Sequence, residues 1–320
     1  MPSLEKAKDF EYAGVAIAKR AEFEGASDEV LAKERAKAQT FVDNYGGKIY
    51  EGYEAMISSD EVDAVYTPLP PALHYKWAKR ALENGKHVFL EKPSTCCLKD
   101  TQDLVNTAAS KGLVLHENYM FVFHNQIKEL QVILSDREIL GTPHLFRIAF
   151  GFPRRAQNDF RYQRELGGGA LLDAGGYTIK LASILLGDTA KLTAAGVSYD
   201  SDFGVDIFGT ATLVNDDGLT AQVAFGMDND YHCDIEVWGS KGTLTSGRIL
   251  TAPVGCVPTY TLKKNQEYTE HKFSEDDAFL KSIFRFAACC ENDKLRKENY
   301  NVILRQSKYV DDFRQLANME

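Results

Sequence analysis

GKHVFLEKP, residues 85–93, is the stretch that decides the fold of the first part of this chain. Its apolar run, His87 to Leu90, is typical of a short buried strand, and Glu91, Lys92 and Pro93 follow where that strand ends. Ligands of open α/β sheets bind beyond the carboxyl ends of the strands. The stretch therefore predicts that Lys92 lies at a ligand-binding edge.

A second stretch, LGGGALLDAGGY at residues 166–177, stands further along the chain. Its glycines lead into a predicted helix that carries Asp173 and Tyr177, and residues at this spacing lie on one helix face. The two stretches together offer a lysine and a tyrosine for proton transfer.

The first part of the chain alternates strands and helices, which is typical of a parallel, doubly wound sheet. We expect strands at 12–18, 62–66, 87–90 and 113–116, and helices at 27–44, 72–84 and 98–110. This predicts a Rossmann-type dinucleotide-binding domain over residues 1–120.

The second part changes to short alternating strands and longer helices, which indicates an α+β domain over residues 121–320. We expect helices at 125–134, 170–186, 276–291 and 299–318, a strand at 144–152, and several strands between 191 and 272 with a hairpin turn at 215–218. The predicted fold class is α/β, with a parallel Rossmann-type sheet followed by an open, mostly antiparallel sheet.

The two motifs resemble those of the Gfo/Idh/MocA oxidoreductases, whose members carry EKP and G-G-G-x-L-x-D-x-G. The resemblance runs from the start of the chain to at least Gly187. Tyr177 stands where many members have histidine, as in the dihydrodiol dehydrogenases and nucleotide-sugar 3-ketoreductases. The longer matches TPLPPALHY (67–75), ENYMF (117–121) and the run 159–177 resemble the ketoreductases most.

The same resemblance implies that a first strand and its G-x-G-x-x-G turn are missing. MPSLEKAKDF corresponds to the back half of the first helix, so roughly twenty or more family residues have no counterpart here. Two alternatives follow: an oxidoreductase with a shortened beginning, or a sugar-binding protein that no longer binds a cofactor.

Lys19 and Arg20 follow the strand at which a Rossmann domain selects its ribose. Cations there suit the 2′-phosphate of NADP, whereas a carboxylate would suit NAD, so we expect NADP with NAD as the alternative. The resemblance adds later strand ends as cofactor contacts: Thr67, Pro68, Leu69, Pro70, His74, Glu91, Lys92, Pro93 and Asn118. Taken alone, His74 is as well explained by packing.

Reduction of a ketone needs a hydride donor, a proton for the oxygen, and polarisation of the developing negative charge. Tyr177 is the expected proton donor, and the Lys92 ammonium is expected to bring its pKa toward neutrality. Asp173 could orient the substrate or Lys92.

Basic and aromatic residues precede the second motif and could clamp a diphosphate while Tyr162 stacks on a base or sugar. The cluster comprises Arg154, Arg155, Arg161, Tyr162 and Arg164. The expected substrate contacts are Tyr119, His124, Arg154, Arg155, Tyr162 and Tyr177.

Composition restricts the partners. A net charge of −9 disfavours nucleic acids and anionic membranes, and no apolar run reaches the roughly 20 residues of a membrane span. The six cysteines have neither zinc-site nor disulfide spacing, so we expect reduced thiols and no metal. The N-terminus has no signal-peptide pattern, which predicts a cytoplasmic protein. The family resemblance implies a homodimer or homotetramer.

The function expected from these features is NADP-dependent reduction of a keto group on a sugar, most plausibly a nucleotide-linked sugar. Three alternatives stay open: dehydrogenation of a free sugar or trans-dihydrodiol, cofactor-assisted glycoside cleavage, and sugar binding without catalysis.

Overall fold

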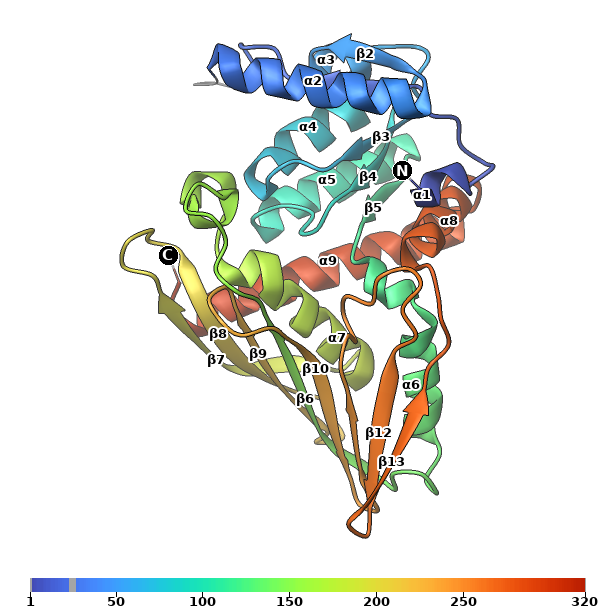
Figure 1. The fold of residues 1–320 in the computed structure, drawn as a ribbon, viewed down its shortest axis with the longest axis vertical. Coiled ribbons are helices and arrows are strands. Elements are labelled where there is room, and N and C mark those ends of the chain that lie inside the picture. Colours follow the sequence, from blue (N-terminus) through green and yellow to red (C-terminus); the bar gives the residue numbers. More distant parts are fainter. Residues whose placement is uncertain (1, 23–26, 320) are drawn as a thin grey trace.

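The computed structural model describes residues 2–22 and 27–319. An α/β part with short parallel strands lies above a broad, twisted sheet, and the last helix runs between the two (Figure 1). That helix, α9 (Asp293–Leu316), packs against α5 (Leu98–Lys111) of the first part and against α7 (Gly176–Leu186) and β7 (Lys191–Tyr199) of the second. It contributes Tyr300 and Ile303 to the core of the first part, and Tyr309, Val310 and Phe313 to that of the second.

The first part contains five parallel strands in two sheets, β1-β2 and β3-β4-β5. Its elements are α1 (Pro2–Glu5), β1 (Gly14–Ile17), α2 (Asp28–Tyr45), β2 (Lys48–Glu51), α3 (Tyr53–Ile57), β3 (Ala64–Thr67), α4 (Pro71–Glu83), β4 (His87–Leu90), α5 (Leu98–Lys111) and β5 (Leu115–Glu117). Over the described residues, no strand pairs with the second edge of β1 or with the outer edge of β3. The parallel strands thus form two sheets rather than one.

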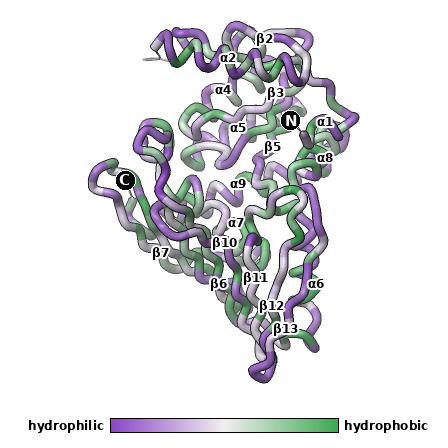
Figure 2. The backbone as a smooth tube through the Cα atoms, in the orientation of Figure 1, coloured by the Kyte–Doolittle hydropathy of each residue, from purple (hydrophilic) through white to green (hydrophobic). Residues whose placement is uncertain are grey.

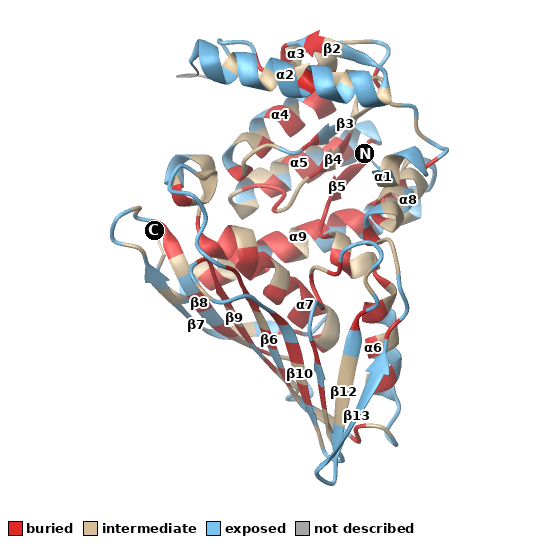
Figure 3. Cartoon of the chain, in the orientation of Figure 1, coloured by how far each residue is buried: buried red, intermediate tan, exposed pale blue. Residues whose placement is uncertain are grey.

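Local sequence explains the helices of this part. Ser27 caps α2, because its hydroxyl accepts a hydrogen bond from the Val30 N–H at 3.3 Å. Pro71 opens α4, where a missing N–H costs nothing. α2 is mostly hydrophilic and exposed, whereas α4 and α5 bury one face against the strands (Figures 2 and 3).

The second part is built on eight strands in the order β13-β12-β11-β10-β6-β9-β8-β7, antiparallel except for the parallel pair β6–β9. The strands are β6 (Pro143–Gly151), β7 (Lys191–Tyr199), β8 (Asp206–Val214), β9 (Thr220–Gly226), β10 (His232–Gly239), β11 (Thr243–Ser246), β12 (Thr259–Lys264) and β13 (Glu267–Lys272). The helices are α6 (Asn125–Ser135), α7 (Gly176–Leu186), α8 (Ala278–Glu291) and α9 (Asp293–Leu316). Short helical turns lie at η1 (Met120–Phe123), η2 (Phe160–Tyr162), η3 (Arg164–Leu166) and η4 (Leu171–Gly175). This confirms the predicted fold class.

One face of the large sheet forms the core with α7 and α9. Along β9, Ala221, Val223 and Phe225 are buried, while Gln222 between them is exposed. This period of two places alternate residues on opposite faces. The segment Arg164–Leu186 is long and apolar enough to span a membrane, but 78% of its most apolar window is buried in the protein. This segment, which comprises η3, η4 and α7, lies in the core of the second part.

Several boundaries differ from the sequence prediction. The helix expected over 170–186 is a π-helical turn followed by α7, and the last helix begins at Asp293 rather than 299 because Asn292 caps it. β2 and α3 were not predicted, since each has only four or five residues. The hairpin at 215–218 is present, with the Asn215 side chain accepting hydrogen bonds from the N–H groups of Asp217 and Leu219.

Candidate active site

Lys92, Asp173 and Tyr177 meet between the two parts of the molecule. Lys92 follows β4, and its ammonium lies 2.8 Å from the Asp173 carboxylate and 2.9 Å from the Asp173 carbonyl oxygen. The same nitrogen lies 4.9 Å from the centre of the Tyr177 ring. The two sequence motifs therefore form one site.

The π-helical turn η4 presents Asp173 to Lys92. Such turns are rare and often occur at functional sites. The turn starts where the Asp206 carboxylate accepts a hydrogen bond from the Leu171 N–H at 2.6 Å. Gly169 permits this, because a Cβ there would lie 2.1 Å from that carboxylate and its φ is +118°. The glycines before the helix thus let its first turn approach Asp206.

Asp173 is held between two cations. Its second carboxylate oxygen lies 2.6 Å from Nε of Arg161, which also pairs with Asp159 at 3.1 Å. Burial opposes ionisation of Asp173, but Lys92 and Arg161 outweigh it and bring its pKa to about 2. Burial likewise disfavours the charge on Lys92, yet Asp173 outweighs that effect and the pKa of Lys92 is raised. The lysine is therefore held in its charged form.

Tyr177 lies in an aromatic cage made by Tyr119, Phe121 and Phe150, whose ring centres are 5.1 to 5.7 Å from its own. Burial raises the pKa of Tyr177, and the opposing effect of Lys92 is smaller. The expectation that Lys92 brings this pKa toward neutrality is therefore wrong for this arrangement. The ammonium binds Asp173 and lies over the ring, so the phenol stays protonated at neutral pH.

The ends of β3, β4 and β5 bring a second polar group together. One Glu91 oxygen accepts hydrogen bonds from the Tyr66 hydroxyl and the Asn118 side chain, both at 2.8 Å. The structure thus joins the predicted pair Glu91 and Asn118. Tyr66 was missed, although its place just before Thr67 at the strand end was a signal for it.

His74 connects the loops that follow β3 and β4. The ring is fully buried, with one nitrogen 2.7 Å from the Pro93 carbonyl oxygen and the other 2.6 Å from that of Leu69. Burial lowers the pKa of His74. The neutral imidazole can donate to only one of these carbonyl oxygens, and it lies buried between the two predicted cofactor loops.

Two family models match the chain: an oxidoreductase family with an NAD-binding Rossmann fold over residues 10–119, and the GFO/IDH/MocA C-terminal domain over residues 129–245. The chain belongs to the Gfo/Idh/MocA oxidoreductase family. It is 37% identical to the dTDP-3,4-didehydro-2,6-dideoxy-alpha-D-glucose 3-reductase of Actinomadura kijaniata over 87% of this chain and 83% of the relative. It is 36% identical to the enzyme of the same name from Streptomyces violaceoruber, over 91% and 87% of the two chains.

The fold agrees with that assignment. The crystal structure of KijD10, a 3-ketoreductase from Actinomadura kijaniata in complex with NADP and TDP-benzene, superposes with a TM-score of 0.88 at 36% identity. The match covers 98% of this chain and 92% of that one. Both parts of this Gfo/Idh/MocA protein thus share the fold of a known ketoreductase.

Lys19 and Arg20 lie just after β1, as the sequence implied. Arg20 is exposed and pairs with Asp28, which is more exposed still. A second carboxylate, Glu22, accepts hydrogen bonds from the N–H groups of Lys19, Tyr53 and Glu54 at 2.8 to 3.0 Å. Burial opposes ionisation of Glu22, but these backbone bonds outweigh it and lower its pKa.

The basic cluster before the second motif divides into separate groups. Arg161 binds Asp173, a role that the sequence did not suggest. Arg154 pairs with Asp200 at 2.7 Å and with Asp228 at 3.1 Å. Arg155 is exposed, with its guanidinium 5.3 Å from the centre of the Phe152 ring.

Three predicted substrate contacts are buried instead. Tyr162 is 3% exposed and stacks on Phe203 at 4.8 Å, so the predicted stacking on a base or sugar does not fit this arrangement. Tyr119 lies edge-on behind Tyr177, and His124 caps α6 by accepting a hydrogen bond from the Gln126 N–H. These three side chains form the frame of the site, and sequence alone gave no sign of their burial.

Proposed function

We propose that this protein reduces a keto group of a nucleotide-linked sugar with NADPH. The observation that carries the proposal is the arrangement of Lys92, held charged by Asp173 and placed against Tyr177. Its position beside the strand ends of a Rossmann-type domain, and identity of 36–37% to dTDP-keto-sugar 3-reductases, support the same reaction.

In this reaction the carbonyl carbon gains a hydride and the carbonyl oxygen gains a proton. The nicotinamide cofactor supplies the hydride when it is bound. Tyr177 carries the proton on its hydroxyl, and its raised pKa keeps that proton in place at neutral pH. The Lys92 ammonium stabilises negative charge as it develops on the substrate oxygen. Asp173 fixes the position and charge of Lys92.

The residues at the strand ends fit a dinucleotide. Glu91, Asn118 and the loop 67–70 would face the nicotinamide half, while Arg20 and Lys19 would face the adenosine ribose. The Glu22 carboxylate accepts three backbone hydrogen bonds, which occupy most of its capacity to accept one from a ribose hydroxyl. Lys19 and the exposed Arg20, which pairs with Asp28, offer cations to a 2′-phosphate, hence NADP over NAD.

Arg155 is the cation that we assign to a substrate diphosphate, because Arg154 and Arg161 pair with carboxylates of the protein. An exposed guanidinium can form bidentate hydrogen bonds with phosphate oxygens. Arg155→Ala is therefore expected to raise KM for a nucleotide sugar while leaving kcat nearly unchanged.

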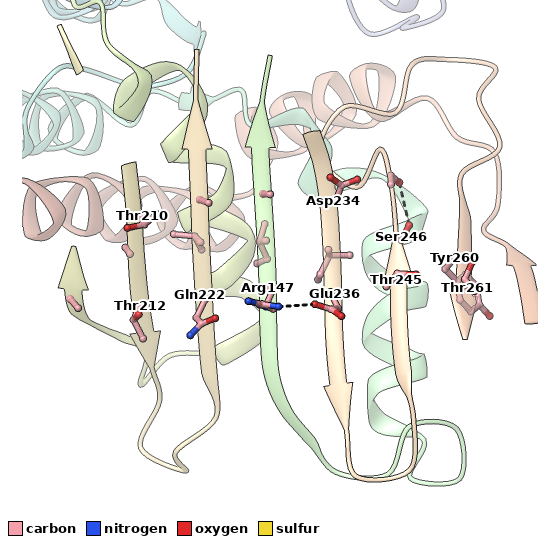
Figure 4. Close-up of a pocket in the computed structure, with 18 of the residues that line it drawn as sticks. Arg147, Thr210, Thr212, Gln222, Asp234, Glu236, Thr245, Ser246, Tyr260 and Thr261 are labelled. Carbon is pink, nitrogen blue, oxygen red and sulfur yellow. Dashed lines mark hydrogen bonds and ion pairs between the residues drawn. The ribbon is translucent and has the colours of Figure 1, made fainter. Parts of the chain in front are cut away.

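The large sheet has an open face, which we expect to pair with a second copy of the chain. A hollow of about 1010 Å³ on this face is lined mostly by small or uncharged residues, together with Asp234 and the ion pair Arg147–Glu236 at 3.5 Å (Figure 4). The lining includes Ala194, Gly196, Thr210, Thr212, Gln222 and Ala224. A homodimer or homotetramer in the cytoplasm is the proposed state.

The test of the function is NADPH oxidation with a dTDP-linked 3-keto sugar, compared with unphosphorylated pentoses and trans-dihydrodiols. We expect turnover with the nucleotide sugar and a higher KM for it in Arg155→Ala. Turnover with the free sugars or diols alone would contradict the proposed substrate class.

A further inference from the structure

An ion pair lies inside the protein behind the proposed catalytic residues. Nζ of Lys180 is 3.5 Å from a carboxylate oxygen of Glu117, and the two side chains are 7% and 3% exposed. Charges buried this deeply lose hydration that their mutual attraction only partly replaces. Neither residue has a part in the chemistry described above, so the pair calls for another explanation.

Glu117 holds the loop that carries Lys92. Its other carboxylate oxygen accepts hydrogen bonds from the Ser94 N–H at 3.0 Å and the Ser94 hydroxyl at 2.8 Å. Ser94 is two residues beyond Lys92, on the same loop after β4. Hydrogen bonds to an ionised acceptor are about twice as strong as those between neutral groups. The charge on Glu117 therefore fixes this loop.

Lys180 belongs to the element that carries Tyr177. It lies three residues further along α7, and its ammonium is 5.4 Å from the centre of the Tyr119 ring. That ring in turn meets the Tyr177 ring edge-on, with centres 5.1 Å apart. The ion pair thus joins the lysine loop to the tyrosine helix.

We infer that Glu117 and Lys180 are positioning residues, which set how the Lys92 ammonium lies relative to Tyr177. The inference rests on the proposed ketoreductase function. Small misplacements of catalytic groups cost rate rather than substrate affinity. Loss of the pair is therefore expected to lower kcat and to leave KM and NADPH binding nearly unchanged.

The surroundings make the role testable through pH. Besides Ser94 and Tyr119, the groups that act on the pair include His116 of β5 and Arg305 of α9, and Gln306 and Arg314 line a small cavity together with Glu117. Burial brings the pKa of His116 to about 3, so this group stays neutral over the working range. In Lys180→Met, the buried Glu117 carboxylate loses its counter-charge and takes up a proton more readily. In this variant, the hydrogen bonds that Glu117 accepts from Ser94 should then weaken as the pH falls.

The experiment compares kcat from pH 6 to pH 9 for the wild type, Lys180→Met and the double variant Lys180→Met/Glu117→Gln. We expect Lys180→Met to lose about 10- to 100-fold in kcat at pH 6 and to regain part of it at pH 9. The double variant should lack this pH dependence, because glutamine does not titrate. Lys281→Met, which breaks the partly exposed pair with Asp276, is the control and should keep the wild-type profile.

Hydrogen exchange at the Ser94 amide gives a readout independent of turnover. It should be faster in Lys180→Met than in the wild type at pH 6. If the wild type has no activity, the proposed function fails and amide exchange alone decides the inference. An active wild type with an unchanged profile in Lys180→Met overturns the inference. If Lys180→Met does not fold, Ser94→Ala decides, since unchanged kcat in that variant would equally overturn it.

Discussion

Asp173 is the residue on which the charge of the site depends. It accepts from Lys92 on one oxygen and from Arg161 on the other, at 2.8 and 2.6 Å. A buried lysine without an anionic partner loses its proton more readily. The carboxylate therefore keeps Lys92 cationic next to a tyrosine that must remain protonated.

Replacing Asp173 by asparagine should change the alkaline side of the pH profile. The change removes the group that raises the pKa of Lys92, while burial and Arg161 continue to lower it. Lys92 then becomes neutral at a lower pH, so kcat should begin to fall roughly one pH unit or more earlier than in the wild type. A kcat profile from pH 6 to pH 10 checks this. An alkaline limb identical to that of the wild type would show that Asp173 does not control Lys92.

The sequence indicated where Lys92, Asp173 and Tyr177 lie, because each belongs to a short motif whose place after a strand or within a helix could be predicted. It misjudged the pKa of Tyr177, since the cage around that ring comes from Phe121 and Phe150, which are distant in the chain. Side-chain burial of this kind depends on tertiary packing, which periodicity does not encode.

At the scale of elements, the π-helical turn η4 could not be predicted, because its hydrophobic pattern is that of the α-helix that follows. The π-helical turn depends on the close approach of Gly169 to Asp206, and these two residues are far apart in the sequence. The strands β3 to β5, in contrast, were close to their predicted places because apolar runs between turn signals define them.

The separation of β1-β2 from β3-β4-β5 leads to a prediction about the cofactor. In the described residues, one edge of β1 and one edge of β3 have no strand partner, so each could pair with one more parallel strand. Fusing a strand, a G-x-G-x-x-G turn and a helix start ahead of residue 2 should tighten NADPH binding by at least about tenfold. Nicotinamide fluorescence titration measures it, with the same fusion carrying valines in the turn as control. Equal NADPH dissociation constants for the unfused chain, the fusion and its valine control would contradict the prediction that an added strand and glycine turn complete the cofactor site.

At the scale of the whole molecule, the open face of the large sheet carries a hollow of about 1010 Å³. Ala224 lies on it between the buried residues Val223 and Phe225 of β9. A charged side chain there would prevent close contact with a second sheet without entering the core.

Ala224→Arg should therefore convert an oligomer to monomers while the melting temperature of the fold changes little. Light scattering gives the mass, and Thr269→Arg on the exposed edge strand β13 is the control that should remain oligomeric. A wild-type protein of 35.7 kDa in solution, the mass of a single chain, would contradict the proposed assembly.

The central claim is that Lys92 and Tyr177 carry out proton transfer and charge stabilisation in a keto-sugar reduction. Single-turnover oxidation of bound NADPH by a dTDP-linked 3-keto sugar tests it most directly, in the wild type, Lys92→Met and Tyr177→Phe. We predict that both variants bind NADPH normally but transfer hydride about 10²- to 10⁴-fold more slowly. Hydride transfer at the wild-type rate in either variant, with bound cofactor and substrate, would contradict the account.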